Sequence, residues 1–104
     1  MSTVDVCTLA ELPSGQRRQL SVEGIDVSVF NCEGRLFAIE DRCSHDDGPL
    51  GEGDLDTAAC TVECPRHGAK FDLASGRPLT LPAYEPVETF PVTVEDHIIK
   101  LEVS

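Results

Sequence analysis

Two short motifs, each with one cysteine and one histidine, constrain this 104-residue chain more than any other feature. The first, C-x-H, comprises Cys43 and His45; the second, C-x-x-H, comprises Cys64 and His67, with 18 residues between His45 and Cys64. Thiolate and imidazole are both ligands for zinc and for iron–sulfur centres. Four such ligands can hold a two-iron cluster with Cys on one iron and His on the other. The spacing therefore predicts a metal centre where two segments meet.

The length of the chain is that of one domain, so residues 1–104 are expected to fold as a single unit. No apolar run approaches the roughly 18 residues of a membrane span, so no membrane association is expected. The first residues show no basic segment followed by an apolar one, as a secretory signal requires. A cytoplasmic location is therefore expected.

Acidic residues outnumber basic ones, with 19 Asp and Glu against 8 Lys and Arg, which gives a formal net charge of −11. Binding to nucleic acid requires a basic surface, so this balance argues against a nucleic-acid partner. An acidic protein is instead steered towards a basic patch on a protein partner, although charge that serves only solubility gives the same composition.

Three of the five cysteines lie outside the two motifs. An odd total without a secretory signal argues against a disulfide scaffold. Cys7, Cys32 and Cys60 have no histidine at short range, and they are expected to be small buried hydrophobic residues.

Most of the chain alternates between apolar and polar residues with period two, which is typical of half-buried β-strands. Turn residues separate these runs at close spacing, as in antiparallel hairpins. The predicted strands are 4–9, 18–22, 25–30, 35–40, a short one within 57–63, 69–72, 87–94 and 98–103, with one helical turn at 10–12. His97 lies between the last two strands and is expected to be a solvated turn residue.

The stretch from 41 to 59 shows no period and is predicted to be a loop. Loops this long in a small domain are usually functional. Since no segment has a sustained helical period, the expected fold class is all-β. It is an antiparallel sandwich or barrel with a small loop-rich subdomain, about residues 41–76, that carries the ligands.

The paired motifs, with the continuation over residues 68–76, resemble Rieske-type ferredoxins, and the resemblance extends over almost the whole chain. It implies one [2Fe–2S] cluster of the Rieske type. In that arrangement Cys43 and Cys64 bind the inner iron, and His45 and His67 bind the outer iron near the surface. Neutral imidazoles in place of two thiolates make the cluster less negative and raise its potential relative to an all-thiolate site.

The resemblance is to one branch of that family. Rieske proteins of cytochrome bc complexes have an additional Cys in each cluster loop, whereas the corresponding positions here are Gly48 and Arg66. High-potential members also have Ser and Tyr hydroxyls that donate towards the cluster, where this chain has Ala69 and Phe71. A potential near the low end of the Rieske range, about −150 mV, is therefore expected. The proline-rich stretch near 78–82 is expected to cover the far side of the cluster.

Other readings of the four ligands are less favoured. A structural zinc site is chemically allowed, but its usual pairs are C-x₂₋₄-C and H-x₃₋₅-H rather than mixed ones. A cysteine-nucleophile enzyme pairs one Cys with one His and leaves the second motif unexplained. A chance meeting of unrelated loop residues is the third alternative.

The resemblance implies a monomeric one-electron carrier of a ring-hydroxylating dioxygenase system. Its expected partners are a flavin-dependent NAD(P)H reductase and a terminal non-haem iron oxygenase. No 2-His-1-carboxylate set is visible in the sequence, so the chain is not expected to be an enzyme by itself. The alternatives are a Rieske-like small subunit of a nitrite reductase, an accessory redox protein of iron–sulfur assembly, and a zinc-stabilised interaction module.

Overall fold

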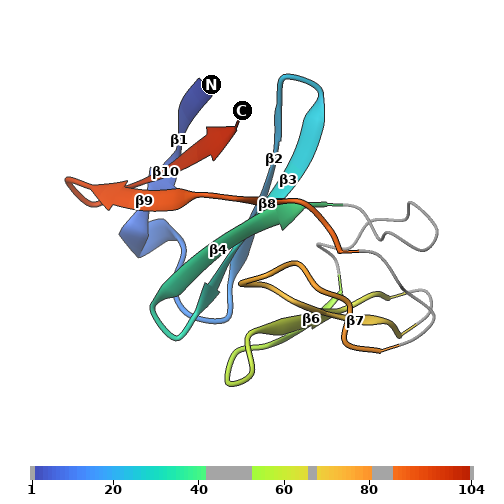
Figure 1. Ribbon diagram of the computed structural model, residues 1–104. Coiled ribbons are helices and arrows are strands. Elements are labelled where there is room, and N and C mark those ends of the chain that lie inside the picture. Colours follow the sequence, from blue (N-terminus) through green and yellow to red (C-terminus); the bar gives the residue numbers. More distant parts are fainter. Residues whose placement is uncertain (1, 42–52, 66–67, 81–85, 104) are drawn as a thin grey trace.

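A computed structural model describes residues 2–41, 53–65, 68–80 and 86–103, and these residues form three antiparallel sheets (Figure 1). The terminal sheet has the order β1 (Ser2–Thr8), β10 (Ile98–Val103), β9 (Val92–Glu95). The central sheet has the order β2 (Arg17–Val22), β3 (Ile25–Cys32), β4 (Arg35–Glu40), β8 (Thr89–Phe90). The small sheet has the order β5 (Asp54–Asp56), β6 (Thr61–Glu63), β7 (Lys70–Asp72). The predicted all-β antiparallel class is confirmed, and the predicted helical turn is a 3-10 turn at Leu9–Glu11.

Tight turns join the hairpins at the places that the sequence predicted. The β2–β3 turn has Glu23 and Gly24 at φ 51° and 82°. Asp96 and His97 join β9 to β10 at φ 51° and 66°. Two consecutive residues with positive φ match the right-handed twist of the paired strands. The prediction that His97 is an exposed turn residue is confirmed.

Strand β3 is buried on both faces, because each face contributes residues to a different hydrophobic core. One face contributes Val27 and Val29 to a core shared by the terminal and central sheets. The other face contributes Phe30 and Cys32 to a second core, which also contains Val62 of β6. The small sheet therefore packs against the central sheet through this second core, which removes apolar surface of both sheets from water.

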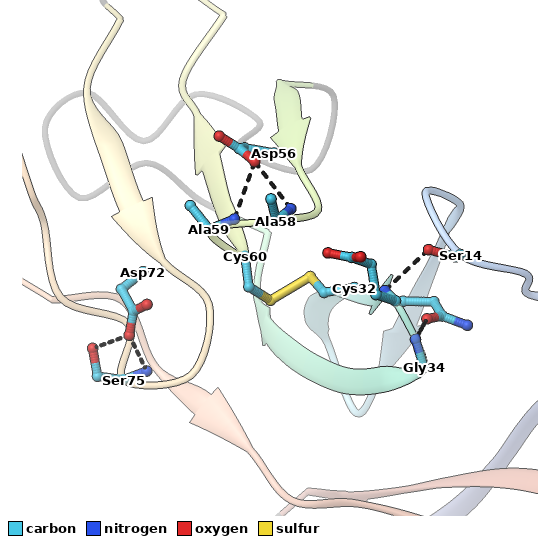
Figure 2. Close-up of a disulfide and its surroundings, with 11 residues drawn as sticks. Ser14, Cys32, Gly34, Asp56, Ala58, Ala59, Cys60, Asp72 and Ser75 are labelled. Atoms are coloured by element: carbon cyan, nitrogen blue, oxygen red, sulfur yellow. Dashed lines mark hydrogen bonds between the residues drawn. A yellow bond between two sulfur atoms is a disulfide. The ribbon is translucent and has the colours of Figure 1, made fainter.

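A disulfide joins the central and small sheets and corrects the expectation for two of the cysteines. Cys32 at the end of β3 and Cys60, just before β6, are bonded, with their Cα atoms 5.6 Å apart (Figure 2). Both are buried, as expected, but they are covalent partners rather than separate small hydrophobes. Asp56 shapes the turn before Cys60, because its carboxylate accepts the N–H groups of Ala58 and Ala59 at 3.0 and 3.1 Å.

Two strand predictions also differ from the structure. The strand expected at 87–94 is two strands in different sheets, β8 and β9, separated by Pro91. Proline has no N–H to donate to a ladder, which accounts for the change of sheet at that residue. Strand β5 was not predicted, since Asp54–Asp56 is too short to show a period. Among the described residues, no helix is long and apolar enough to cross a membrane.

Candidate iron–sulfur site

The second motif begins where β6 ends, and the β6–β7 connection holds its cysteine in place. The N–H of Cys64 donates to the carbonyl of Ala69 at 2.7 Å, and the N–H of Gly68 donates to the carbonyl of Cys64 at 3.0 Å. Gly68 has φ +73°, a conformation that glycine adopts without strain. These bonds close the ligand turn, defined here as the connection from Cys64 to Ala69.

Cys64 has the chemistry that a cluster ligand requires. Its side chain is 1% exposed, and its thiol is not part of a disulfide. Cys32 and Cys60 are bonded to each other, and Cys7 lies on β1 in the terminal sheet. Cys64 is thus the free cysteine at this end of the small sheet among the described residues, and a buried cysteine sulfur there fits an iron–sulfur centre.

The other three predicted ligands, Cys43, His45 and His67, lie outside the described residues. Within the described part of the chain, no group of three or more His, Cys, Asp or Glu side chains forms a metal site. Of the four predicted ligands, the structure therefore describes only Cys64, next to the undescribed 66–67, and the ligand set stays a prediction.

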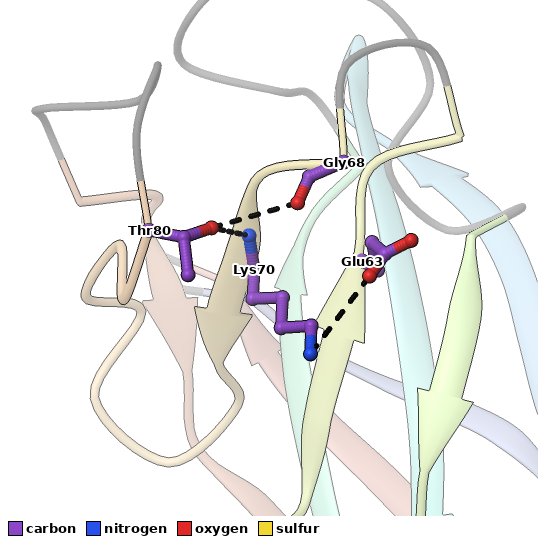
Figure 3. Close-up of polar contacts among 4 residues, drawn as sticks. All are labelled: Glu63, Gly68, Lys70 and Thr80. Carbon is purple, nitrogen blue, oxygen red and sulfur yellow. Dashed lines mark hydrogen bonds and ion pairs between the residues drawn. The ribbon is translucent and has the colours of Figure 1, made fainter.

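A segment from a later part of the chain lies against β7 next to the ligand turn (Figure 3). The N–H of Leu79 donates to the carbonyl of Lys70 at 2.6 Å. The hydroxyl of Thr80 accepts the N–H of Lys70 at 2.8 Å and lies 3.5 Å from the carbonyl of Gly68. Residues 78–80 are the described part of the proline-rich stretch near 78–82, and they lie beside the ligand turn; 81 and 82 lie outside the described residues, so the expectation that the stretch covers the far side of the cluster stays a prediction.

A tight turn at residues 72–76 brings this segment back towards the small sheet. The Ser75 N–H and hydroxyl donate to the Asp72 carboxylate at 3.0 and 2.7 Å, and the Gly76 N–H donates to the Asp72 carbonyl at 2.7 Å. Gly76 cannot be replaced without movement, because an added Cβ would lie 2.2 Å from the carbonyl oxygen of Val87. Gly76 also accepts the N–H of Val87 at 2.8 Å, which fixes where the chain leaves the proline-rich stretch.

The charged pair on this hairpin contributes little to its stability. Lys70 Nζ lies 4.0 Å from the Glu63 carboxylate, and both side chains are well exposed. Exposed pairs of this kind are worth about 0–1 kcal/mol. The hydrogen bonds of the backbone and of Thr80, rather than this ion pair, define the ligand turn.

Comparison with known proteins identifies the family. The model of the Rieske [2Fe–2S] domain matches residues 2–91. The chain belongs to the Rieske [2Fe–2S] domain family. The predicted [2Fe–2S] cofactor is thereby confirmed, and Cys64 in its ligand turn fits it.

Relatives of this Rieske protein are ferredoxins. It is 45% identical over 104 residues to the 3-phenylpropionate/cinnamic acid dioxygenase ferredoxin subunit of Photorhabdus laumondii, covering 100% of this chain and 97% of that one. The ferredoxin of carbazole 1,9a-dioxygenase from Nocardioides aromaticivorans superposes with a TM-score of 0.91 at 32% identity, with 97% of each chain covered. A complex of reduced oxygenase and oxidised ferredoxin in carbazole 1,9a-dioxygenase matches at TM-score 0.89 and 29% identity, covering 95% of this chain and 91% of that one. The prediction of an electron-transfer protein rather than an enzyme is confirmed.

The positions at which the high-potential branch has hydroxyls are fully buried here. Ala69 and Phe71 have no exposed surface, and both belong to the core shared by the small and central sheets. We expect Ala69→Ser and Phe71→Tyr each to raise the reduction potential, because a donor near sulfur stabilises the more negative reduced state. At ~1–2 kcal/mol per donor, each shift is roughly 40–90 mV, and the pair shifts the potential furthest. Protein-film voltammetry measures the reduction potential of each variant.

The matched control for this prediction is Ala38→Ser. Ala38 is also buried, but in the other core, between the central and terminal sheets. The potential of that variant should equal that of the unmodified protein. A potential well above zero in the unmodified protein would refute the argument from absent hydroxyls.

Proposed function

We propose that Cys43, His45, Cys64 and His67 hold the cluster, with the cysteines on the inner iron and the histidines on the outer one. The observation that carries this assignment is the buried free thiol of Cys64 at the end of β6. When bound, the cluster supplies a one-electron redox couple. The ligand-bearing part, about residues 41–76, belongs to a single domain over residues 1–104.

The proposed role is to carry single electrons from a flavin-dependent NAD(P)H reductase to the terminal non-haem iron oxygenase of a ring-hydroxylating dioxygenase. Similarity to ferredoxin subunits of such dioxygenases supports this role, as does similarity to a ferredoxin seen in complex with its oxygenase. The protein is proposed to act in the cytoplasm, as a monomer. The three alternatives are a nitrite reductase subunit, an accessory redox protein of iron–sulfur assembly and a zinc-stabilised interaction module, and none of the relatives named above supports them.

Reconstitution tests this role directly. Purified protein should show the visible absorption and electron paramagnetic resonance of a Rieske cluster after reduction. It should then couple NAD(P)H oxidation by a flavin reductase to product formation by an oxygenase of this class, at a rate proportional to its concentration. A protein with bound zinc and no such spectrum would contradict both the cofactor and the role.

Docking is proposed to use the cluster end, through a small apolar patch inside an acidic surround. The proposed patch is His45, Pro49, Leu50, Pro65 and His67. Pro65 is exposed, and Leu79, bonded through its N–H to β7, is 54% exposed. Transient redox partners use small interfaces of this kind.

Electron delivery should slow as salt rises, because the net charge of −11 steers the protein towards a basic partner surface and salt screens that attraction. We expect a fall of about tenfold in the second-order rate between low and high ionic strength, measured by stopped-flow oxidation of reduced ferredoxin. The potential, measured at the same salt concentrations, is the control for changes in driving force. A rate independent of ionic strength would show that the charge serves only solubility.

A further inference from the structure

The backbone of residues 77–79 pairs with the outer edge of β7, through an antiparallel bridge between Phe71 and Pro78, and beside the ligand turn a side chain continues that pairing. In an antiparallel strand the N–H and C=O of one residue point to the same side. The carbonyl of Ala69 points towards β6, where it accepts the N–H of Cys64. The N–H and C=O of Lys70 therefore point to the opposite edge, where their partners are the Thr80 hydroxyl and the Leu79 N–H (Figure 3).

The hydroxyl of Thr80 makes two contacts across this edge. It accepts the N–H of Lys70 at 2.8 Å, and it donates towards the carbonyl of Gly68 across a longer 3.5 Å. A hydroxyl has one donor and two acceptor sites, so both contacts can form together. Gly68 and Lys70 lie on either side of Ala69, so the side chain of Thr80 spans the end of the ligand turn. The N–H of Leu79 adds a third bond, to the carbonyl of Lys70.

We propose that Thr80 is a positioning residue for the iron–sulfur centre: its hydroxyl fixes the backbone of Gly68 and Lys70, which directly follows the proposed ligands, and so strengthens the binding of iron by those ligands. The inference rests on the proposed ligand set. Thr80 acts through the backbone of Gly68 and Lys70 and needs no contact with the cluster. Groups hydrogen-bonded directly to metal ligands commonly change metal affinity by about 10–100-fold when they are removed, and we expect the lower end of that range for a group that acts through the adjoining backbone.

This role differs from a general contribution to stability. Thr80 is exposed, so water takes the place of its hydroxyl when the hydroxyl is removed. The free energy of unfolding of the sheets therefore changes little. Only the shape of the ligand turn loses a constraint. A positioning role therefore predicts loss of cluster retention without an equivalent loss of folding stability.

The test compares three variants of the cluster-loaded protein. Thr80→Val keeps the shape of the side chain without its hydroxyl, and Thr80→Ser keeps the hydroxyl. Ser14→Ala is the matched control, because the exposed hydroxyl of Ser14 likewise accepts one backbone N–H, that of Glu33, at 3.0 Å (Figure 2). The measurements are the rate of visible bleaching with an iron chelator, the electron paramagnetic resonance line width after reduction, and the melting curve by circular dichroism.

We expect Thr80→Val to bleach about tenfold or more faster than the unmodified protein, with broadened resonance lines and an unchanged melting curve of the apo form. Thr80→Ser and Ser14→Ala should stay within about twofold of it. If Thr80→Val is isolated without a cluster, full cluster content in Thr80→Ser supports the proposal. Bleaching of Thr80→Val at the unmodified rate, equal acceleration in Ser14→Ala, or a colourless but folded Thr80→Ser each overturns it. Failure of the proposed ligand set is a different result, since retention of the spectrum in a ligand variant reveals it whatever the outcome at Thr80.

Discussion

Replacing His67 with alanine is expected to remove the cluster and give a colourless or unstable protein. The change leaves one iron with an open coordination position and the ligand turn without its organising centre, and binding at such sites is coupled to local folding. The same loss is expected for alanine at Cys43, His45 or Cys64. The loss of the cluster is measured by the iron and acid-labile sulfide content, by visible absorption, and by electron paramagnetic resonance of the reduced protein.

The chain provides matched controls for both ligand types. His97 is the third histidine and lies exposed in the β9–β10 turn, and Cys7 is a free cysteine on β1. His97→Ala and Cys7→Ala should keep the full spectrum and the full iron content. A full-intensity Rieske spectrum in any of the four ligand variants, or its loss in His97→Ala, is incompatible with the assignment.

The strands and the family could be predicted from the sequence because their signals are local. Alternation with period two identified the hairpins of the central sheet, and turn residues such as Glu23 and Gly24 marked their ends. The pattern over β3 indicated one apolar face. Its second face is buried only because the small sheet packs on it, as Phe30 and Cys32 show, and a contact between distant segments leaves no period in the sequence.

The parts that could not be predicted all depend on such distant contacts. Strand β5 exists through its pairing with β6, and three residues are too few for a pattern. Thr80 reaches Lys70 across 10 residues, and a single threonine in a proline-rich stretch carries no signal for that bond. Cys32 and Cys60 are separated by 28 residues, and disulfide connectivity cannot be deduced from sequence alone, so the cysteine count gave the wrong expectation for these two residues.

The Cys32–Cys60 bridge is expected to make the largest single contribution to folding stability that the described residues show. It closes a sequence separation of 28 residues, and restricting the unfolded chain over that length is worth about 3–4 kcal/mol in the chain-entropy model. For a domain of this size, that corresponds to a melting temperature higher by on the order of 15 °C. Urea unfolding of the apo protein, with the bridge intact and after full reduction, measures the difference.

The thiol count decides whether the bridge is present in the sample. Acid-treated, denatured protein should show three reactive thiols, because two of the five cysteines are joined. In the proposed cytoplasmic location thiols are kept reduced, but both cysteines are buried, and thiol–disulfide exchange requires an attacking thiolate to reach one of the two sulfurs. Cys60→Ala should lower the midpoint of urea unfolding as reduction does, whereas Cys7→Ala should leave that midpoint unchanged. Since Cys60 anchors β6 four residues before Cys64, Cys60→Ala should also release the cluster at a lower temperature. Five thiols, or equal midpoints with and without reduction, would show that the two cysteines only fill the core.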